Sequence, residues 1–220
     1  MLWSDWYPYV RPELPGAPTP LLDHYILQAA IHFFEESQVW TESLTAINLV
    51  ADTGTYTLTV PAVSLGATTT TADVSMVKWV WVDEHQVYPS SQEELGMIGD
   101  NWTTHTSAFV TNYTQLTQDT ITLYPIPNYA STGGLKIKVA VRPGLTSTGV
   151  PDWLGQKYVQ EIATRVKAEM MGMVNQPWTN AAGEQKYAAA YQSALTKATV
   201  EGNRSFTRTS MTVRFKKFVR

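Results

Sequence analysis

The residues that could carry out chemistry are few, and their spacing does not suit it. The chain has no cysteine, which excludes disulfides, thiolate zinc sites, iron–sulfur clusters and a cysteine nucleophile. Its histidines, His24, His32, His85 and His105, show neither of the spacings H-x-x-x-H and H-E-x-x-H that zinc sites on helices use. We therefore expect no metal site and no cofactor, and we assign these histidines surface or packing roles.

Serine nucleophiles and paired carboxylates are also poorly supported. The G-x-S-x-G elbow of serine hydrolases is absent. Gly133 and Gly134 precede a predicted strand instead of a helix, so they suit a hairpin turn and not a phosphate-binding loop. Acidic pairs such as Glu35-Glu36, Asp83-Glu84 and Glu93-Glu94 are adjacent, and adjacent side chains diverge on a helix or a strand. The sequence therefore predicts a protein that is not an enzyme.

The composition indicates a folded protein that takes part in assembly. The chain has 220 residues, of which 44% are hydrophobic, and it includes 8 Trp and 11 Tyr. Such rings bury large areas at low conformational cost and are enriched at interfaces. The start lacks the pattern of a signal peptide, and no apolar stretch has the length of a membrane span, so we expect neither secretion nor a membrane partner.

Charge is distributed unevenly along the chain. The formal net charge is −3, but six of the 16 lysines and arginines lie in residues 204–220, which contain no acidic residue. The other ten face all 19 acidic residues, so residues 1–203 carry −9 and the last 17 carry +6. An acidic body is followed by a basic segment.

The basic segment alternates in part between polar and apolar residues, as a strand does. Fully extended, it would reach about 55–60 Å. We predict an arm, or a strand lent to a neighbour, that docks on another protein; binding to nucleic acid and a solvated tail are the alternatives. The candidate partner-binding residues are Arg204, Arg208, Met211, Val213, Arg214, Phe215, Lys216, Lys217, Phe218 and Arg220.

Apolar periodicity predicts three long helices. The proline-rich residues 6–20 favour an extended, polyproline-like course, after which Thr19 suits an N-cap and Pro20 a first helical position. Spacings of three and four predict helices over about 20–37, 151–175 and 180–201, the last ending at Gly202-Asn203.

Between the first and second helices the period shifts toward two. Strands are predicted near residues 46–51, 54–60, 74–82, 108–113, 120–124 and 135–141, with a turn over 128–134 and a short helix over 92–98. Residues 77–82 carry bulky apolar groups on both faces, which predicts a central strand covered on both sides or a strand at an interface.

These elements predict an α+β fold. The N- and C-terminal helices form a three-helix bundle, into which an antiparallel β-rich domain is inserted, and an extended C-terminal arm follows. The predicted divisions are residues 1–40 with 150–203 for the bundle, 41–149 for the β-rich domain and 204–220 for the arm. The pattern leaves open whether the β-rich domain is a barrel or a sandwich.

The first 40 residues resemble the start of the head-to-tail adaptor proteins of short-tailed bacteriophages, also called portal adaptors or head-completion proteins. The resemblance is carried by YVRPELPGAP at 9–18, PLL at 20–22, AAIHFFEES at 29–37 and VW at 39–40. Beyond these residues the chain is similar only in layout.

The resemblance implies a structural protein of the virion, assembled in the host cytoplasm and located at the portal–tail junction. Its partners would be the portal protein, nozzle or fibre proteins of the tail, and further copies of itself in a ring of twelve. The helices would form the collar, the β-rich domain would face the tail, and the arm at 204–220 would insert between portal subunits. DNA would pass through the ring without sequence-specific binding.

A second hypothesis makes the β-rich domain a carbohydrate- or receptor-binding module of a virion tail. Trp79, Trp81 and Trp102 would then be stacking platforms for a ligand. The ordinary interpretation of the three tryptophans, which we favour, is burial in the core or in a subunit interface.

Overall fold

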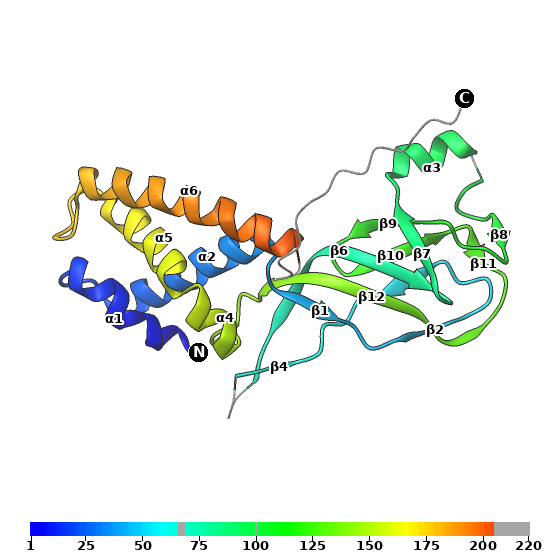
Figure 1. The fold of residues 1–220 in the computed structure, drawn as a ribbon, viewed down its shortest axis with the longest axis horizontal. Coiled ribbons are helices and arrows are strands. Elements are labelled where there is room, and N and C mark those ends of the chain that lie inside the picture. The colour runs from blue at the N-terminus through cyan, green and yellow to red at the C-terminus, as the bar shows by residue number, and fades with distance from the viewer. Residues whose placement is uncertain (66–68, 100, 205–220) are drawn as a thin grey trace.

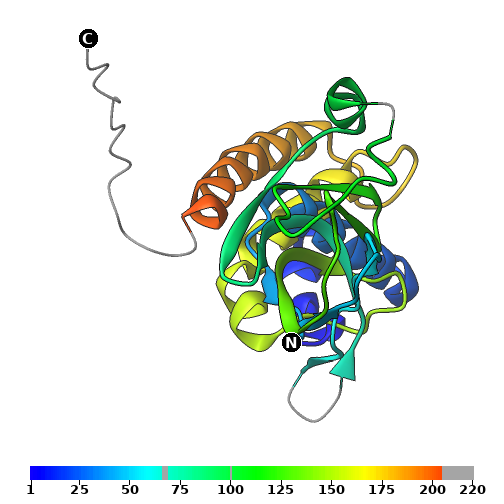
Figure 2. The ribbon, with the colours of Figure 1, turned by 90° about the vertical axis from the view of Figure 1, so that its right-hand side faces the viewer.

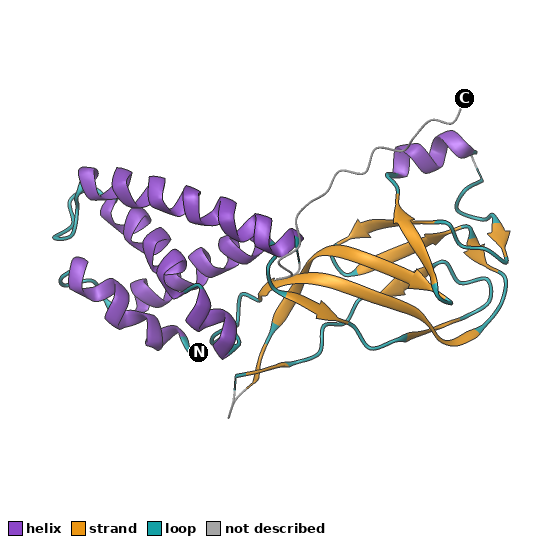
Figure 3. Cartoon of the chain, in the orientation of Figure 1, coloured by secondary structure: helices purple, strands orange, loops and turns teal. Residues whose placement is uncertain are grey.

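The computed structural model describes residues 1–65, 69–99 and 101–204. The molecule is elongated, with its long helices at one end and its strands at the other (Figure 1, Figure 3). The fold is mixed α/β, and the described residues form six α-helices and a large curled β-sheet. The predicted combination of helices with a β-rich middle is therefore confirmed at this level.

The proline-rich opening is helical, and the prediction of an extended course was wrong. It forms a 3-10 helix at Trp3–Trp6, the helix α1 at Tyr7–Val10 and a second 3-10 helix at Arg11–Glu13. Pro8 and Pro12 each lie at the start of a helix, where the missing proline N–H costs no hydrogen bond. Burial of Trp6, Val10 and Leu14 holds these short turns against the rest of the protein.

Helix α2, at Thr19–Ser37, matches the first predicted helix. Its N-cap is Pro18, one residue before the predicted Thr19. The helix ends at Gln38, which has a left-handed backbone (φ 52°) and donates its N–H to the carbonyl of Phe34 at 3.0 Å. The buried side is the predicted apolar one: Leu22, Ile26, Ala29, Ala30, Phe33 and Phe34.

The second predicted helix is interrupted. Helix α4 spans Asp152–Lys157 and α5 spans Val159–Met171, and Tyr158 between them has a non-helical backbone (φ −112°, ψ 20°). The Tyr158 ring lies 5.0 Å from that of Phe33, and its hydroxyl donates to Glu201 Oε2 at 2.8 Å. A contact between distant helices thus accompanies the break, and helical periodicity alone did not predict it.

Helix α6 spans Ala181–Asn203, close to the third predicted helix. It begins at Asn180, whose Oδ1 accepts a hydrogen bond from the Gly183 N–H at 3.0 Å. Helices α2, α5 and α6 contact one another. Glu13 ties the opening segment to two of them, because Lys167 Nζ of α5 donates to its Oε1 at 2.6 Å and the Tyr187 hydroxyl of α6 donates to its Oε2.

The main sheet has the order β1-β12-β6-β7-β9-β10-β3, with β2 also paired to β12. Its strands are β1 (Thr41–Ser43), β2 (Ile47–Leu49), β3 (Thr55–Thr57), β6 (Ala72–Val82), β7 (His85–Pro89), β9 (Asn112–Thr117), β10 (Thr120–Tyr124) and β12 (Ser131–Pro143). Two small pairs join β4 (Val63–Ser64) to β5 (Thr69–Thr70), and β8 (Thr106–Ser107) to β11 (Ile126–Pro127). Figure 2 views the curled sheet in front of the helices.

The predicted sheet needs three corrections. The pairs β7–β9 and β11–β8 are parallel, because helix α3 (Gln92–Ile98) and a loop separate β7 from β9 and supply the longer connection that a parallel pair requires. The strand predicted at 108–113 lies at 112–117, and β7 was missed. Gly133 and Gly134 lie within β12 at a register shift, and Gly133 has φ +64°, so they form a bulge and not a hairpin turn.

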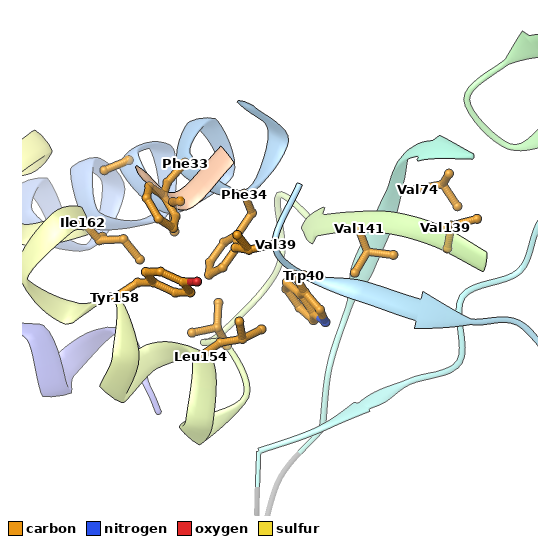
Figure 4. Close-up of a cluster of buried hydrophobic side chains, with 14 of the residues drawn as sticks. Phe33, Phe34, Val39, Trp40, Val74, Val139, Val141, Leu154, Tyr158 and Ile162 are labelled. Carbon is orange, nitrogen blue, oxygen red and sulfur yellow. The ribbon is translucent and has the colours of Figure 1, made fainter. Parts of the chain in front are cut away.

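One hydrophobic cluster extends from the helices into the sheet. The fully buried Trp40 lies where the two meet, with its ring centroid 5.6 Å from that of Phe34 and its carbonyl accepting a hydrogen bond from the Val141 N–H at 2.9 Å. Figure 4 shows Trp40 and Val39 between Phe34 and Tyr158 of the helices and Val139 and Val141 of β12. Such a shared core restricts movement of the helices relative to the sheet.

Candidate functional site

The structure describes only the first of the ten candidate residues in the C-terminal arm. Arg204 follows the last residue of α6, and its N–H donates to the carbonyls of Val200 and Glu201 at 3.2 and 3.1 Å. The other nine lie outside the described residues: Arg208, Met211, Val213, Arg214, Phe215, Lys216, Lys217, Phe218 and Arg220. The site can therefore be built from the point where the arm begins.

The end of α6 is fixed tightly against the end of α2. A Cβ atom on Gly202 would lie 2.4 Å from the backbone oxygen of Ser37 and 3.2 Å from the backbone of Gln38. Only a residue without a side chain allows this approach. Ser37 is fully buried, so the packing of two helices determines the place from which residues 204–220 leave the body.

Beside this point lies an exposed surface that combines tryptophans and lysines. We call it the tryptophan–lysine face and define it by Met76, Trp79 and Trp81 of β6 with Lys136 and Lys138 of β12. Trp79 is 49% exposed and Trp81 is 41% exposed. Lys138 is opposite Trp79 and Lys136 is opposite Trp81 in the strand register, and Lys138 Nζ lies 5.1 Å from the centre of the Trp79 ring.

A small pocket connects this face to the end of α6. It has a volume of about 130 Å³ and is lined by Thr41, Lys78, Trp79, Lys138, Gly202 and Asn203. Lys78 Nζ donates to the side-chain oxygen of Gln38. Burial and the neighbouring charge of Lys138 lower the pKa of the Lys78 amine. Two amines therefore share a partly buried site next to the start of the arm.

The three tryptophans of the carbohydrate-binding hypothesis do not gather on one surface. Trp79 and Trp81 point out from the same face of β6, so the part of our interpretation that placed them in the core was wrong. Trp102 is half-buried in a turn after α3, away from the strands of the main sheet. Strand β6 is central in the sheet, as predicted, but its outer face is exposed at Met76, Trp79 and Trp81.

Sequence reasoning missed the lysines and the glutamine of this site. The signal for the tryptophans was present in the imperfect alternation of residues 77–82, but Lys136 and Lys138 belong to a strand more than 50 residues away. Their contact with β6 follows from the pairing of β12 with β6. Gln38 joins the site only because α2 ends beside the sheet.

Residues with catalytic potential are not brought together. Within the described ranges, no three His, Cys, Asp or Glu residues lie in a group that could hold a metal ion. Ser75 and Lys78 have the spacing of serine–lysine hydrolases, but both lie on a strand, and they line different pockets. His32 has a packing role, with its Nδ1 2.9 Å from the Tyr191 hydroxyl. In the part of the chain that is described, no helix combines the length and apolarity that crossing a membrane requires.

Comparison with known families decides the kind of protein. A family model described as SU10 adaptor protein matches residues 4–214, nearly the whole chain. The chain belongs to the SU10 adaptor protein family. This adaptor is therefore a bacteriophage adaptor protein, which confirms the resemblance seen in its first 40 residues and makes it a structural component of the virion. Among curated proteins, no match to this adaptor is found.

Proposed function

We propose that this protein is a non-enzymatic subunit of a phage connector that joins the portal to the tail machinery as a ring around the DNA exit channel. The observation that carries the proposal is membership of the adaptor family over residues 4–214. In this proposal the ring has twelve copies, the helices including α2, α5 and α6 act together as the collar, the β-rich part contacts tail proteins, and DNA passes without sequence-specific binding.

We further propose that residues 204–220 dock on the portal. The contact of Gly202 with Ser37 supports this role, because it gives every copy in a ring the same point of departure for its arm. The arm carries six basic residues, which would be attracted to acidic grooves between portal subunits, and its apolar residues could fill pockets there.

Deletion of residues 205–220 tests the role of the arm. We expect the shortened protein to keep its circular dichroism spectrum and thermal midpoint, since the described body contains the continuous core, but to lose sedimentation with purified portal rings. Two full-length variants then separate the contributions. One replaces the five cations at 208, 214, 216, 217 and 220 with Gln, and the other replaces Met211, Val213, Phe215 and Phe218 with Ser. Unchanged portal binding after the deletion would refute the docking role.

The exposure of Trp79 and Trp81 also keeps the carbohydrate-binding hypothesis testable. The lysines beside them argue against it, because Lys138 lies over the Trp79 ring that a sugar would need. Binding of the intact protein to immobilised host glycans, lost on Trp79→Ala with Trp81→Ala, would favour a receptor-binding function. We expect no such binding.

A further inference from the structure

The tryptophan–lysine face has the chemistry of a protein interface. Trp and Met are enriched at the centres of interfaces, and tryptophan is among the residues that contribute most to binding. Here Met76, Trp79 and Trp81 are each exposed by 40% or more on one central strand. Exposed apolar groups gathered in this way on a folded protein indicate an interaction site.

The charge of the face selects its partner. The neighbouring strands place Thr41 and Ser43 of β1, and Gln86 of β7, in register with these residues, and none of the three is acidic. Lys136, Lys138 and Lys78 thus cluster without a carboxylate at these positions, and the lowered pKa of Lys78 reflects in part the repulsion between amines. A partner that brings carboxylates would relieve this repulsion.

The chain's own arm does not fit this description. It begins at Arg204, next to the face, and its remaining cations are Arg208, Arg214, Lys216, Lys217 and Arg220. Like charges at short range oppose its folding back over the three lysines. The arm therefore leaves the face free for another occupant.

A nucleic acid fits less well than a protein. Bases stack on open aromatic faces, whereas Lys138 already lies over the Trp79 ring. The body that carries the face has a formal charge of −9 over residues 1–203, which repels phosphates over distances up to the Debye length. The same −9 makes the body of a second copy an acidic surface.

We infer that the tryptophan–lysine face binds the acidic body of a neighbouring copy of this chain. The inference rests on the proposed ring, in which each copy contacts the next through two different surfaces. It assigns one of these surfaces to Met76, Trp79, Trp81, Lys136 and Lys138, and it separates two roles: the face joins copies to each other, and the arm joins copies to the portal.

Photo-crosslinking from the face identifies its partner directly. The full-length protein with Trp81→p-benzoylphenylalanine is prepared as an equal mixture of isotope-labelled and unlabelled chains, assembled with portal rings and irradiated. We expect crosslinked peptides that join a labelled to an unlabelled copy, with Asp or Glu in the acceptor peptide. Acceptor peptides from the portal or a tail protein, or crosslinks confined to one copy, would overturn the inference.

Charge reversal provides the second test. We expect Lys136→Glu with Lys138→Glu to weaken self-association by at least about tenfold, as loss of a central interface contact does, measured by sedimentation equilibrium without portal. Lys186→Glu with Lys197→Glu makes the same change of charge on α6 and should leave association unchanged. Equal effects of the two pairs, or tryptophan quenching by a single-stranded oligothymidylate that Trp79→Ala with Trp81→Ala abolishes, would contradict it.

The two proposals fail in different ways. Copy-to-copy crosslinks without portal binding would refute the docking role of the arm and leave the face assigned. Portal binding that survives Lys136→Glu with Lys138→Glu, together with unchanged self-association, would refute the face and leave the arm.

Discussion

Replacing Gly202 with alanine tests whether the end of α6 is held by close packing. In an unobstructed helix this change is stabilising by about 0.5–1 kcal/mol, because alanine loses less backbone entropy on folding. Here the new Cβ would lie 2.4 Å from the Ser37 oxygen. Reaching ordinary contact at 3.4 Å requires a shift of 1.0 Å between two backbones, which no side-chain rotation can provide.

The expected result of Gly202→Ala is a net loss of stability. Overpacking of a tight contact costs about 1–3 kcal/mol, which exceeds the gain in helix propensity. We therefore expect the free energy of unfolding to fall by about 0.5–2 kcal/mol. Because the last turn of α6 must move, the start of the arm moves with it, and portal binding should weaken beyond the loss of stability.

Urea unfolding followed by tryptophan fluorescence measures this effect. Gly96→Ala is the matched control, since Gly96 lies inside helix α3 and a Cβ there would meet no atom within 4 Å. The control should be as stable as the wild type or slightly more so. A midpoint for Gly202→Ala at or above that of the wild type would show that the contact with Ser37 does not constrain α6.

Three further changes test the parts of the fold that support the site. Trp40→Ala should cost about 3–5 kcal/mol, as for a buried tryptophan, and an unchanged guanidinium midpoint would show that the shared core is unimportant. Burial raises the pKa of Glu13, but hydrogen bonds from Lys167 and Tyr187 outweigh this and hold it below the usual value; the stabilisation is therefore present above the unfolded-state pKa and is lost as the pH falls through the folded-state pKa. Glu13→Gln should cost only about 1 kcal/mol at pH 7, since the carboxylate is partly exposed and screened, and a difference from the wild type that persists at pH 3 would contradict this linkage. Tyr158→Phe should cost about 1 kcal/mol for the lost hydrogen bond, measured as a shift in urea midpoint, and a cost as large as that of Tyr158→Ala would show that ring packing contributes little.

The sequence by itself determined the kind of protein and most of its elements. Regular spacing of apolar residues, from Leu22 to Phe34, suffices to locate a helix because one face must be buried. The absence of cysteine and of clustered histidine spacings directed the hypothesis toward assembly, and the residues before Trp40 carried the family resemblance. The acidic body and the basic end were also readable as charge, which needs no fold.

Only the tertiary structure decided which distant residues meet. The break at Tyr158 accompanies a bond to Glu201 that lies 43 residues away, and the helical course of the proline-rich opening depends on burial of Trp6 against other segments. Local spacing carries no information about such contacts. The tryptophan–lysine face likewise exists because β12 pairs with β6 in one register, which places lysines beside tryptophans that the sequence separates.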